Sequence, residues 1–366
     1  MSPEHFNYRT LGHWRGIAAL GVMIFHGFGA IRSSGQSVHE NLVWLKDLSD
    51  FGGFGVHIFF VISGYCIAAN VYQLQRRKLG AWEFFRDRAL RIYPAYWAAC
   101  LAAIVANLIA SPFNAVSIKD NFPLDWWSAV ANVFLIEPYV GVDRLLLLVS
   151  WSLVYEIGFY AIVAIGFGLF RVGINIWLLF VGAAVLAVCG LLGWHQGVRY
   201  VLKFWPEFLS GSVVFLALWL RAHSLFLARL AILLPILFVL IKALSGSDKG
   251  WPGEMVVVAG FSLLLVWLYR WDSQLAAWRG LNWLDWGGAI SYSLYLIHVP
   301  FGTRVINLAS RWVSHDSLWV LPLQICYWLV SIAAAYLFFC FCERPLNNWR
   351  GRLKRKAVLL AAVRVA

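Results

Sequence analysis

The feature that most constrains this chain is a series of long apolar stretches separated by charged segments. Of its 366 residues, 61% are hydrophobic and only 13% are charged, whereas soluble domains carry about 25% charged residues. A bilayer offers the backbone no hydrogen-bond partner, so an apolar stretch that crosses it must be helical. The sequence therefore predicts an all-α, polytopic membrane helix bundle of about ten transmembrane helices. The predicted spans are 14–31, 51–73, 92–112, 150–170, 176–194, 200–220, 229–244, 254–270, 287–308 and 318–342.

The distribution of basic residues orients this bundle. The formal net charge is +12, and many basic residues cluster beside apolar stretches, at 76–91 and 344–356. Cytoplasmic loops are enriched in Lys and Arg, so both termini are predicted to be cytoplasmic, and the charge does not indicate nucleic acid binding. The first helix is predicted to be retained and not cleaved as a signal. We expect a single domain over 1–366, with a cytoplasmic N-terminus (1–13), a membrane bundle (14–344) and a basic cytoplasmic tail (345–366).

The connection after the third span holds a further predicted helix. Trp126 to Ile136 is predicted to form a short helix on the membrane surface.

The six cysteines lie in or beside apolar stretches, with no spacing typical of a disulfide framework or a zinc site. Cys340 and Cys342 are too close together for either, so we predict no metal and treat the cysteines as core residues.

Arg15 and His26 lie on one apolar helix. Eleven residues separate them, about three turns, so both side chains project from the same face roughly 16 Å apart along the axis. Ionisable residues inside a span are costly and point to function. A lone intramembrane histidine is more often a hydrogen-bonded packing residue, but the arginine on the same face favours a functional interpretation of His26.

Glu156 is the only acidic residue between Leu145 and Phe170. An unpaired carboxylate in such a stretch is strongly unfavourable, or it takes up a proton. Alternating helix directions place Glu156 in the outer half of the bilayer, level with His26. We therefore predict a histidine–carboxylate pair, in which Glu156 fixes the tautomer of His26 and raises its basicity. A purely structural hydrogen bond between helices is the alternative.

Ser291, Tyr295 and His298 follow one another at helical spacing and form a polar stripe on one face. Such a stripe could bind a substrate, and packing against a neighbouring helix explains it equally well. With Ser63 and Tyr160, these residues are our candidates for acceptor binding or pocket lining. Ser63 is not predicted to be a nucleophile, because no Gly-x-Ser-x-Gly turn surrounds it.

Arg88 and Arg91 stand at the cytoplasmic mouth of the third span and share a helical face. Ordinary positive-inside charge is sufficient for the basic residues at 76–78. Arg88 and Arg91, however, precede a helix entry that Pro94 kinks. Guanidinium groups match the oxygens of phosphate, so phosphate binding is at least as good an interpretation of this pair.

Six segments in this order resemble the acyltransferase-3 family of integral membrane acyltransferases. Each motif is degenerate alone, but together they are specific and cover nearly the whole chain. They are Arg15 with His26, Gly55-Val-His-Ile-Phe-Phe-Val-Ile-Ser-Gly64, Arg88-Ala-Leu-Arg91-Ile-Tyr-Pro94, Ser150 to Tyr160 with Glu156, Ser291-Tyr-Ser-Leu-Tyr-Leu-Ile-His298, and Glu343-Arg-Pro345.

The resemblance implies ten spans, acetyl-CoA or another acyl-CoA as donor, and transfer of the acyl group to a hydroxyl of a glycan or glycolipid outside the bacterial cytoplasmic membrane. Arg15, Arg88 and Arg91 are then predicted to bind the acyl-CoA. His26 is predicted to take the proton from the acceptor hydroxyl while Glu156 orients its ring. Direct transfer is our preferred route, although an acyl-histidine intermediate is also compatible. Some relatives carry a fused extracytoplasmic domain after the spans. This chain stops too soon for one, so any acceptor-handling partner is expected to be a separate protein.

A proton-coupled transporter or exporter of a glycan or small solute is the alternative. It would use His26, Glu156 and His298 as a proton relay. Transporters are commonly built from repeated halves, and this sequence shows no internal symmetry. A non-catalytic scaffold would not explain an arginine, a histidine and a lone acid in one bundle. Consumption of acetyl-CoA by the purified protein distinguishes transfer from transport.

Overall fold

The computed structural model describes residues 8–33, 39–110, 125–142, 145–192, 202–219, 225–244, 253–309, 312 and 318–363. Within these ranges the regular structure is helical and no strand occurs, which confirms the predicted all-α fold. The longer helices are α1 (Leu11–Ser33), α3 (Gly55–Arg76), α4 (Ala81–Ala110), α7 (Trp151–Arg171), α8 (Ile176–Leu192), α10 (Trp205–Trp219), α11 (Leu225–Leu244), α12 (Gly253–Leu268), α14 (Asn282–Ile297), α16 (Val320–Phe338) and α17 (Arg344–Val363). The shorter ones are α2 (Val43–Asp50), α6 (Trp126–Phe134), α13 (Asp272–Ala277) and α15 (Thr303–Ala309).

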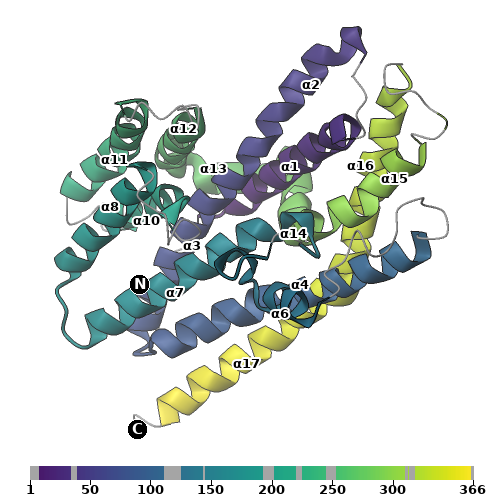
Figure 1. Ribbon diagram of the computed structural model, residues 1–366. Helices are drawn as coiled ribbons and strands as arrows, with labels where there is room; N and C mark the ends of the chain where they lie inside the picture. The colour runs from purple at the N-terminus through teal and green to yellow at the C-terminus, as the bar shows by residue number, and fades with distance from the viewer. Residues whose placement is uncertain are drawn as a thin grey trace.

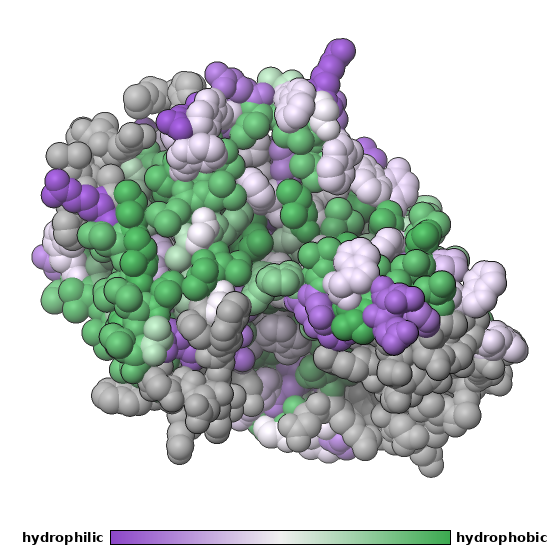
Figure 2. Space-filling view, turned by 90° about the horizontal axis from the view of Figure 1, so that it is seen from above, coloured by the Kyte–Doolittle hydropathy of each residue, from purple (hydrophilic) through white to green (hydrophobic). Residues whose placement is uncertain are grey.

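Several helical stretches suit a bilayer. Among the described residues, five are long and apolar enough to cross a membrane, and α8 and α10 are shorter apolar helices. Many large apolar side chains are exposed to the surroundings, and Figure 2 shows hydrophobic residues over much of one face. The chain is therefore a helical membrane bundle, while ten crossings remain a prediction. The five stretches are Glu40–Arg76, Ala81–Ile109, Leu148–Arg171, Gly253–Ala277 and Val320–Arg355.

Helix α1 lies inside the bundle, between α3 and α14 (Figure 1). Glycines make its contact with α14 unusually close: a Cβ atom added to Gly16 would lie 2.9 Å from the backbone of Gly287, and one added to Gly288 would lie 2.2 Å from the carbonyl of Gly12. Small residues allow membrane helices to approach in this way. This contact fixes the register of α1 against α14.

The helix directions follow from these contacts. Near the start of α1, His13 bonds to Asp285 at the start of α14, and His26 meets His298 just after the end of α14, so the two helices run parallel. A Cβ atom on Gly55, the first residue of α3, would contact Ala18 and Val22, whereas Gly52 faces Gly21. Helix α3 thus runs antiparallel to α1. These are the relative directions expected for the first, second and ninth of ten crossings.

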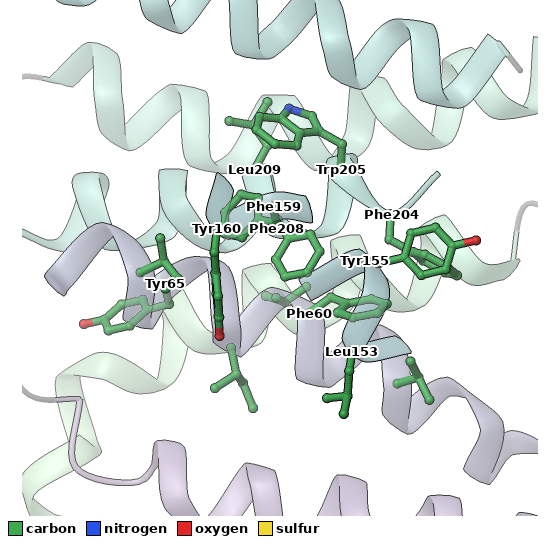
Figure 3. Packing of buried hydrophobic residues seen from close by; sticks show 14 of the residues in the cluster. Phe60, Tyr65, Leu153, Tyr155, Phe159, Tyr160, Phe204, Trp205, Phe208 and Leu209 are labelled. Atoms are coloured by element: carbon green, nitrogen blue, oxygen red, sulfur yellow. The ribbon is translucent and has the colours of Figure 1, made fainter. Parts of the chain in front are cut away.

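Aromatic side chains join α3, α7 and α10 (Figure 3). The rings of Phe159 and Phe208 stack with centroids 4.0 Å apart, and Phe60 packs at 4.7 Å against Phe208. Offset and edge-to-face ring pairs add to the free energy gained from burial. This cluster holds α7 beside α3, which positions Glu156 on α7 close to Ser63 on α3.

The predicted surface helix exists as α6, but it is packed on another helix. The Tyr96 hydroxyl donates to the carbonyl of Asn132 at 2.8 Å, and the Trp97 indole donates to the carbonyl of Val133 at 2.9 Å. Tyr96 and Trp97 lie in the middle of α4. The C-terminal end of α6 is therefore docked against the middle of a long apolar helix, a different position from a helix lying only on the membrane surface.

The closest approach of α3 to α10 yields a stability prediction. A Cβ atom on Gly211 would lie 1.8 Å from the carbonyl oxygen of Val61, so Gly211→Ala should force the helices apart and lower stability by about 1–3 kcal/mol or more. Gly182 on α8 is the matched control, because a Cβ atom there meets nothing within 4 Å. Gly182→Ala should leave stability unchanged or raise it by up to about 1 kcal/mol. Thermal unfolding in detergent measures both, and equal melting temperatures would contradict the close packing.

Candidate active site

A cavity opens between α1, α3, α4, α7 and α14. Its empty volume is about 740 Å³, counting the part open to solvent. Eight of the ten predicted site residues line it, and the two histidines do not. The eight are Arg15, Ser63, Arg88, Arg91, Glu156, Tyr160, Ser291 and Tyr295.

Glu156 is the carboxylate of this cavity. Its Oε1 atom accepts a hydrogen bond from the Ser63 hydroxyl at 3.1 Å and another from the Tyr160 hydroxyl, one turn further along α7. Two hydroxyl donors therefore meet at one oxygen of this carboxylate. Glu156 is therefore held by its own helix and by α3.

Three arginines line the cavity with this carboxylate. Arg15 comes from α1 and lies within electrostatic range of Arg91 and Glu156. Arg91 from α4 interacts in turn with Glu156 and with the Tyr160 hydroxyl. The lining of the cavity thus holds three guanidinium groups and one carboxylate, a composition that suits a ligand with several negative charges.

Arg88 is the most deeply buried of the three. It is only 6% exposed, and its Nε atom has no hydrogen-bond partner in the part of the chain that the structure describes. The nearest carboxylate that it faces is Asp87, at 3.8 Å. A buried charged group without full pairing is strongly unfavourable. Arg88 thus has the bonding capacity expected of a residue that awaits an anion.

Helix α17 packs beside the start of α4, next to Arg88. Its Lys354 and Arg350 approach the carboxylate of Asp87 at 3.2 and 3.8 Å. Because Asp87 precedes Arg88 on α4, these contacts fix the first turns of α4 against α17. Figure 1 shows α17 running beside α4 along one edge of the bundle. The basic segment at 344–356 is therefore helical, and its Arg350 and Lys354 lie beside the start of α4.

His26 lies away from the cavity. It is eleven residues beyond Arg15 on α1, roughly 16 Å along the axis. Its half-buried ring packs at 5.2 Å against Phe25 and at 5.2 Å against His298. Among the described residues, no hydrogen bond or ion pair joins His26 to a carboxylate. The predicted pair of His26 with Glu156 is therefore wrong as a contact, because Glu156 lies at the level of Arg15.

Tyr295 stands between the cavity and the histidines. Its hydroxyl shares a 2.6 Å hydrogen bond with Ser152 and lies 3.1 Å from the carbonyl of Val149. Its ring is 6.2 Å from that of His298. Ser291 lies one turn earlier, and its hydroxyl donates a hydrogen bond to the carbonyl of Gly288 at 2.8 Å. The predicted polar stripe thus leads from the cavity wall to the histidine pair.

Cys66 and Tyr292 are two of the lining residues that were not among the candidates from the sequence. Cys66 faces the cavity three residues after Ser63 on α3, and Tyr292 lines it beside Ser291 while its hydroxyl donates to the carbonyl of Ile92 at 3.1 Å. The spacing of Ser63 and Cys66 equals that of Arg88 and Arg91 and was available as a signal. Cysteine is so often a core residue that the signal was not used.

Fold and site together define an integral membrane protein whose helices enclose an arginine-lined cavity, with a pair of histidines further along α1 and α14. The chain belongs to the acyltransferase-3 family, whose acyltransferase domain matches residues 9–358. The family resemblance inferred from the motifs is thereby confirmed.

Several characterised proteins are similar to this chain. The O-acetyltransferase OatA of Staphylococcus aureus (strain NCTC 8325 / PS 47) is 24% identical over 91% of the chain and 56% of OatA. The exopolysaccharide production protein ExoZ of Rhizobium meliloti is 28% identical over 85% of the chain and 94% of ExoZ. The peptidoglycan O-acetyltransferase OatA of Listeria monocytogenes is 24% identical over 85% of the chain and 53% of that protein. The chain thus spans little more than half the length of the OatA proteins. No solved structure gives a significant match.

Proposed function

We propose that this protein is a membrane O-acyltransferase. It transfers an acyl group, acetyl by preference, from cytoplasmic acyl-CoA to a hydroxyl of a glycan or glycolipid at the outer side of the bacterial cytoplasmic membrane. In this proposal, residues 1–366 form one domain with both termini in the cytoplasm. The observation that carries the proposal is the arginine-lined cavity, in which Arg88 is buried with an unpaired Nε atom.

The cavity suits the nucleotide end of coenzyme A. Its phosphates are compact polyanions, and arginine binds phosphate through paired N–H donors. Arg15, Arg88 and Arg91 would hold these phosphates, and the flexible pantetheine arm would extend past Tyr295 toward His26. In the empty cavity Glu156 offsets part of the arginine charge, a role that replaces the predicted orientation of the histidine ring.

The names of the relatives support the same acceptor class. OatA proteins are O-acetyltransferases, one of them acting on peptidoglycan, and ExoZ serves exopolysaccharide production. Peptidoglycan and exopolysaccharide, the two substances that these names print, are both glycans. An acceptor-handling partner outside the membrane would fit the larger size of the OatA proteins.

The proposed reaction is a direct acyl transfer. His26 accepts the proton of the acceptor hydroxyl as the alkoxide attacks the thioester carbonyl. The new carbon–oxygen bond forms and the carbon–sulfur bond breaks. The coenzyme A thiolate then takes up the proton that His26 accepted from the hydroxyl. The overall test is the mass and linkage of acyl groups on surface glycans with and without the protein. Unchanged acylation without it would refute the proposal.

Donor occupancy of the cavity can be tested through Cys66. In a variant that retains Cys66 as its sole cysteine, saturating coenzyme A should slow alkylation by N-ethylmaleimide at least about fivefold, because a ligand on the arginines covers this thiol. A variant that retains only Cys326, which is exposed on α16, is the control. Its labelling should not change. Equal labelling of Cys66 with and without coenzyme A would place the donor elsewhere.

A further inference from the structure

His298 is fixed in a way that sets its protonation. It is fully buried and opens the π-helical turn His298–Gly302 that joins α14 to α15. Its Nδ1 atom lies 2.8 Å from the carbonyl oxygen of Leu294. A carbonyl can only accept a hydrogen bond, so Nδ1 carries the hydrogen of the neutral ring. The lone pair of the ring is therefore on Nε2.

Among the described residues, that Nε2 atom has no hydrogen-bond partner. It is buried, and no hydrogen bond reaches it from the residues that the structure describes. Buried polar atoms are almost always hydrogen-bonded, so we expect the Nε2 atom of His298 to accept a hydrogen bond from a nearby donor. Tyr295 does not supply it, because its hydroxyl is engaged with Ser152 and Val149.

His26 is placed to be that donor. The two ring centroids are 5.2 Å apart and the rings are inclined by 47°. The ring of His26 makes no hydrogen bond within the described ranges, so nothing in its surroundings selects one tautomer. Rotation about the last side-chain bond of a histidine is soft, and at this separation a modest rotation brings a nitrogen of His26 within hydrogen-bond distance of Nε2.

We propose that His298 is the positioning residue of the active site. Its Nε2 accepts the N–H of His26, which fixes the tautomer of His26 and leaves the other nitrogen free for the acceptor hydroxyl. This inference rests on the proposed function and gives His298 the role first predicted for Glu156. When the hydroxyl proton moves to His26, the N–H held by His298 stays in place, and the same His26 nitrogen then returns the transferred proton to the thiolate of coenzyme A.

The test uses two substitutions of the same residue. Glutamine has an amide oxygen that can accept the N–H of His26, whereas leucine fills the space without an acceptor. In membrane vesicles that contain the native acceptor, His298→Leu should slow release of coenzyme A from acetyl-CoA at least about 100-fold, because the base loses its orientation. His298→Gln should remain within about tenfold of the wild type. The affinity for coenzyme A should change less than about threefold in both, since the arginines are untouched.

Ser331→Ala is the matched control, because Ser331 is buried against Gly302 at the end of the same π-helical turn. It should keep wild-type turnover. Equal losses in the leucine and glutamine variants, or wild-type turnover in His298→Leu, would overturn the role of His298. If His298→Leu is fully active while His26→Ala is inactive, only this inference fails. If His26→Ala is also active, the role of His26 as the base fails with it. The proposed function fails only if the wild-type protein releases no coenzyme A from acetyl-CoA in the presence of the acceptor.

Discussion

His26→Ala is expected to abolish acyl transfer while leaving a folded protein in the membrane. A positioned general base contributes about 10²- to 10⁴-fold to a rate, so turnover of acetyl-CoA in the presence of the acceptor should fall by at least about 100-fold. Because His26 lies three turns from the arginines, the affinity for coenzyme A should be unchanged. Turnover in vesicles and the acetyl content of surface glycans measure the first effect, and calorimetry with coenzyme A measures the second.

The control for this prediction is His39→Ala. His39 lies on a short turn that follows α1, where its ring accepts a hydrogen bond from the backbone of Asn41. This variant removes a histidine without touching the cavity or the histidine pair, so it should keep wild-type turnover. Normal acetylation of the glycan in cells that carry only His26→Ala would show that the imidazole is not the base.

The helices could be predicted because the bilayer leaves the backbone little choice. Within the described residues each predicted span overlaps an observed helix, since an apolar stretch in lipid must satisfy its own hydrogen bonds; the predicted span 287–308 covers α14, a π-helical turn and α15. The two π-helical turns were not predicted. One begins at His298 and the other ends at Glu343, a buried carboxylate that accepts hydrogen bonds from Ser293. Both turns depend on contacts between helices, which no local pattern encodes.

The level of Glu156 was mispredicted for a related reason. Counting from the expected ends of the spans put Glu156 beside His26. Helix α7 begins at Trp151, and its Ser152 reaches only Tyr295, almost one turn short of His298. Glu156 is one further turn away from the histidines, among the arginines. The relative depth of two helices is set by side packing, such as the contact of Phe159 with Phe208, and the chain holds no marker of it.

The cluster of lining residues, by contrast, was accessible from spacing. Arg88 with Arg91, and Ser291 with Tyr295, lie three or four residues apart, which places each pair on one helix face. Polar residues with such spacing inside apolar stretches face the interior of a bundle because lipid excludes them. The sequence therefore identified which faces converge, and the structure supplied the partners across them.

Replacing Arg88 and Arg91 by glutamine is expected to weaken donor binding above all. A hydrogen bond to a charged group is worth about 1.5–3 kcal/mol, so each change should raise the dissociation constant for coenzyme A roughly 10- to 150-fold. Arg86→Gln is the matched control, since Arg86 lies on the same helix but is exposed to solvent. It removes the same charge from the same mouth and should leave affinity within about threefold, because long-range attraction is screened by salt.

Comparing coenzyme A with 3′-dephospho-coenzyme A assigns the contact. If Arg88 binds the 3′-phosphate, Arg88→Gln should lower the affinity for coenzyme A strongly and the affinity for the dephospho form little. The same comparison of one substitution with one removed phosphate applies to Arg91. Arg88 is the better candidate for the tighter contact, because its buried Nε atom is unpaired while Arg91 already faces Glu156 and Tyr160. Equal affinities for coenzyme A in the wild type, Arg88→Gln and Arg91→Gln would show that neither arginine binds the donor. Ordinary positive-inside charge would then be sufficient to explain both.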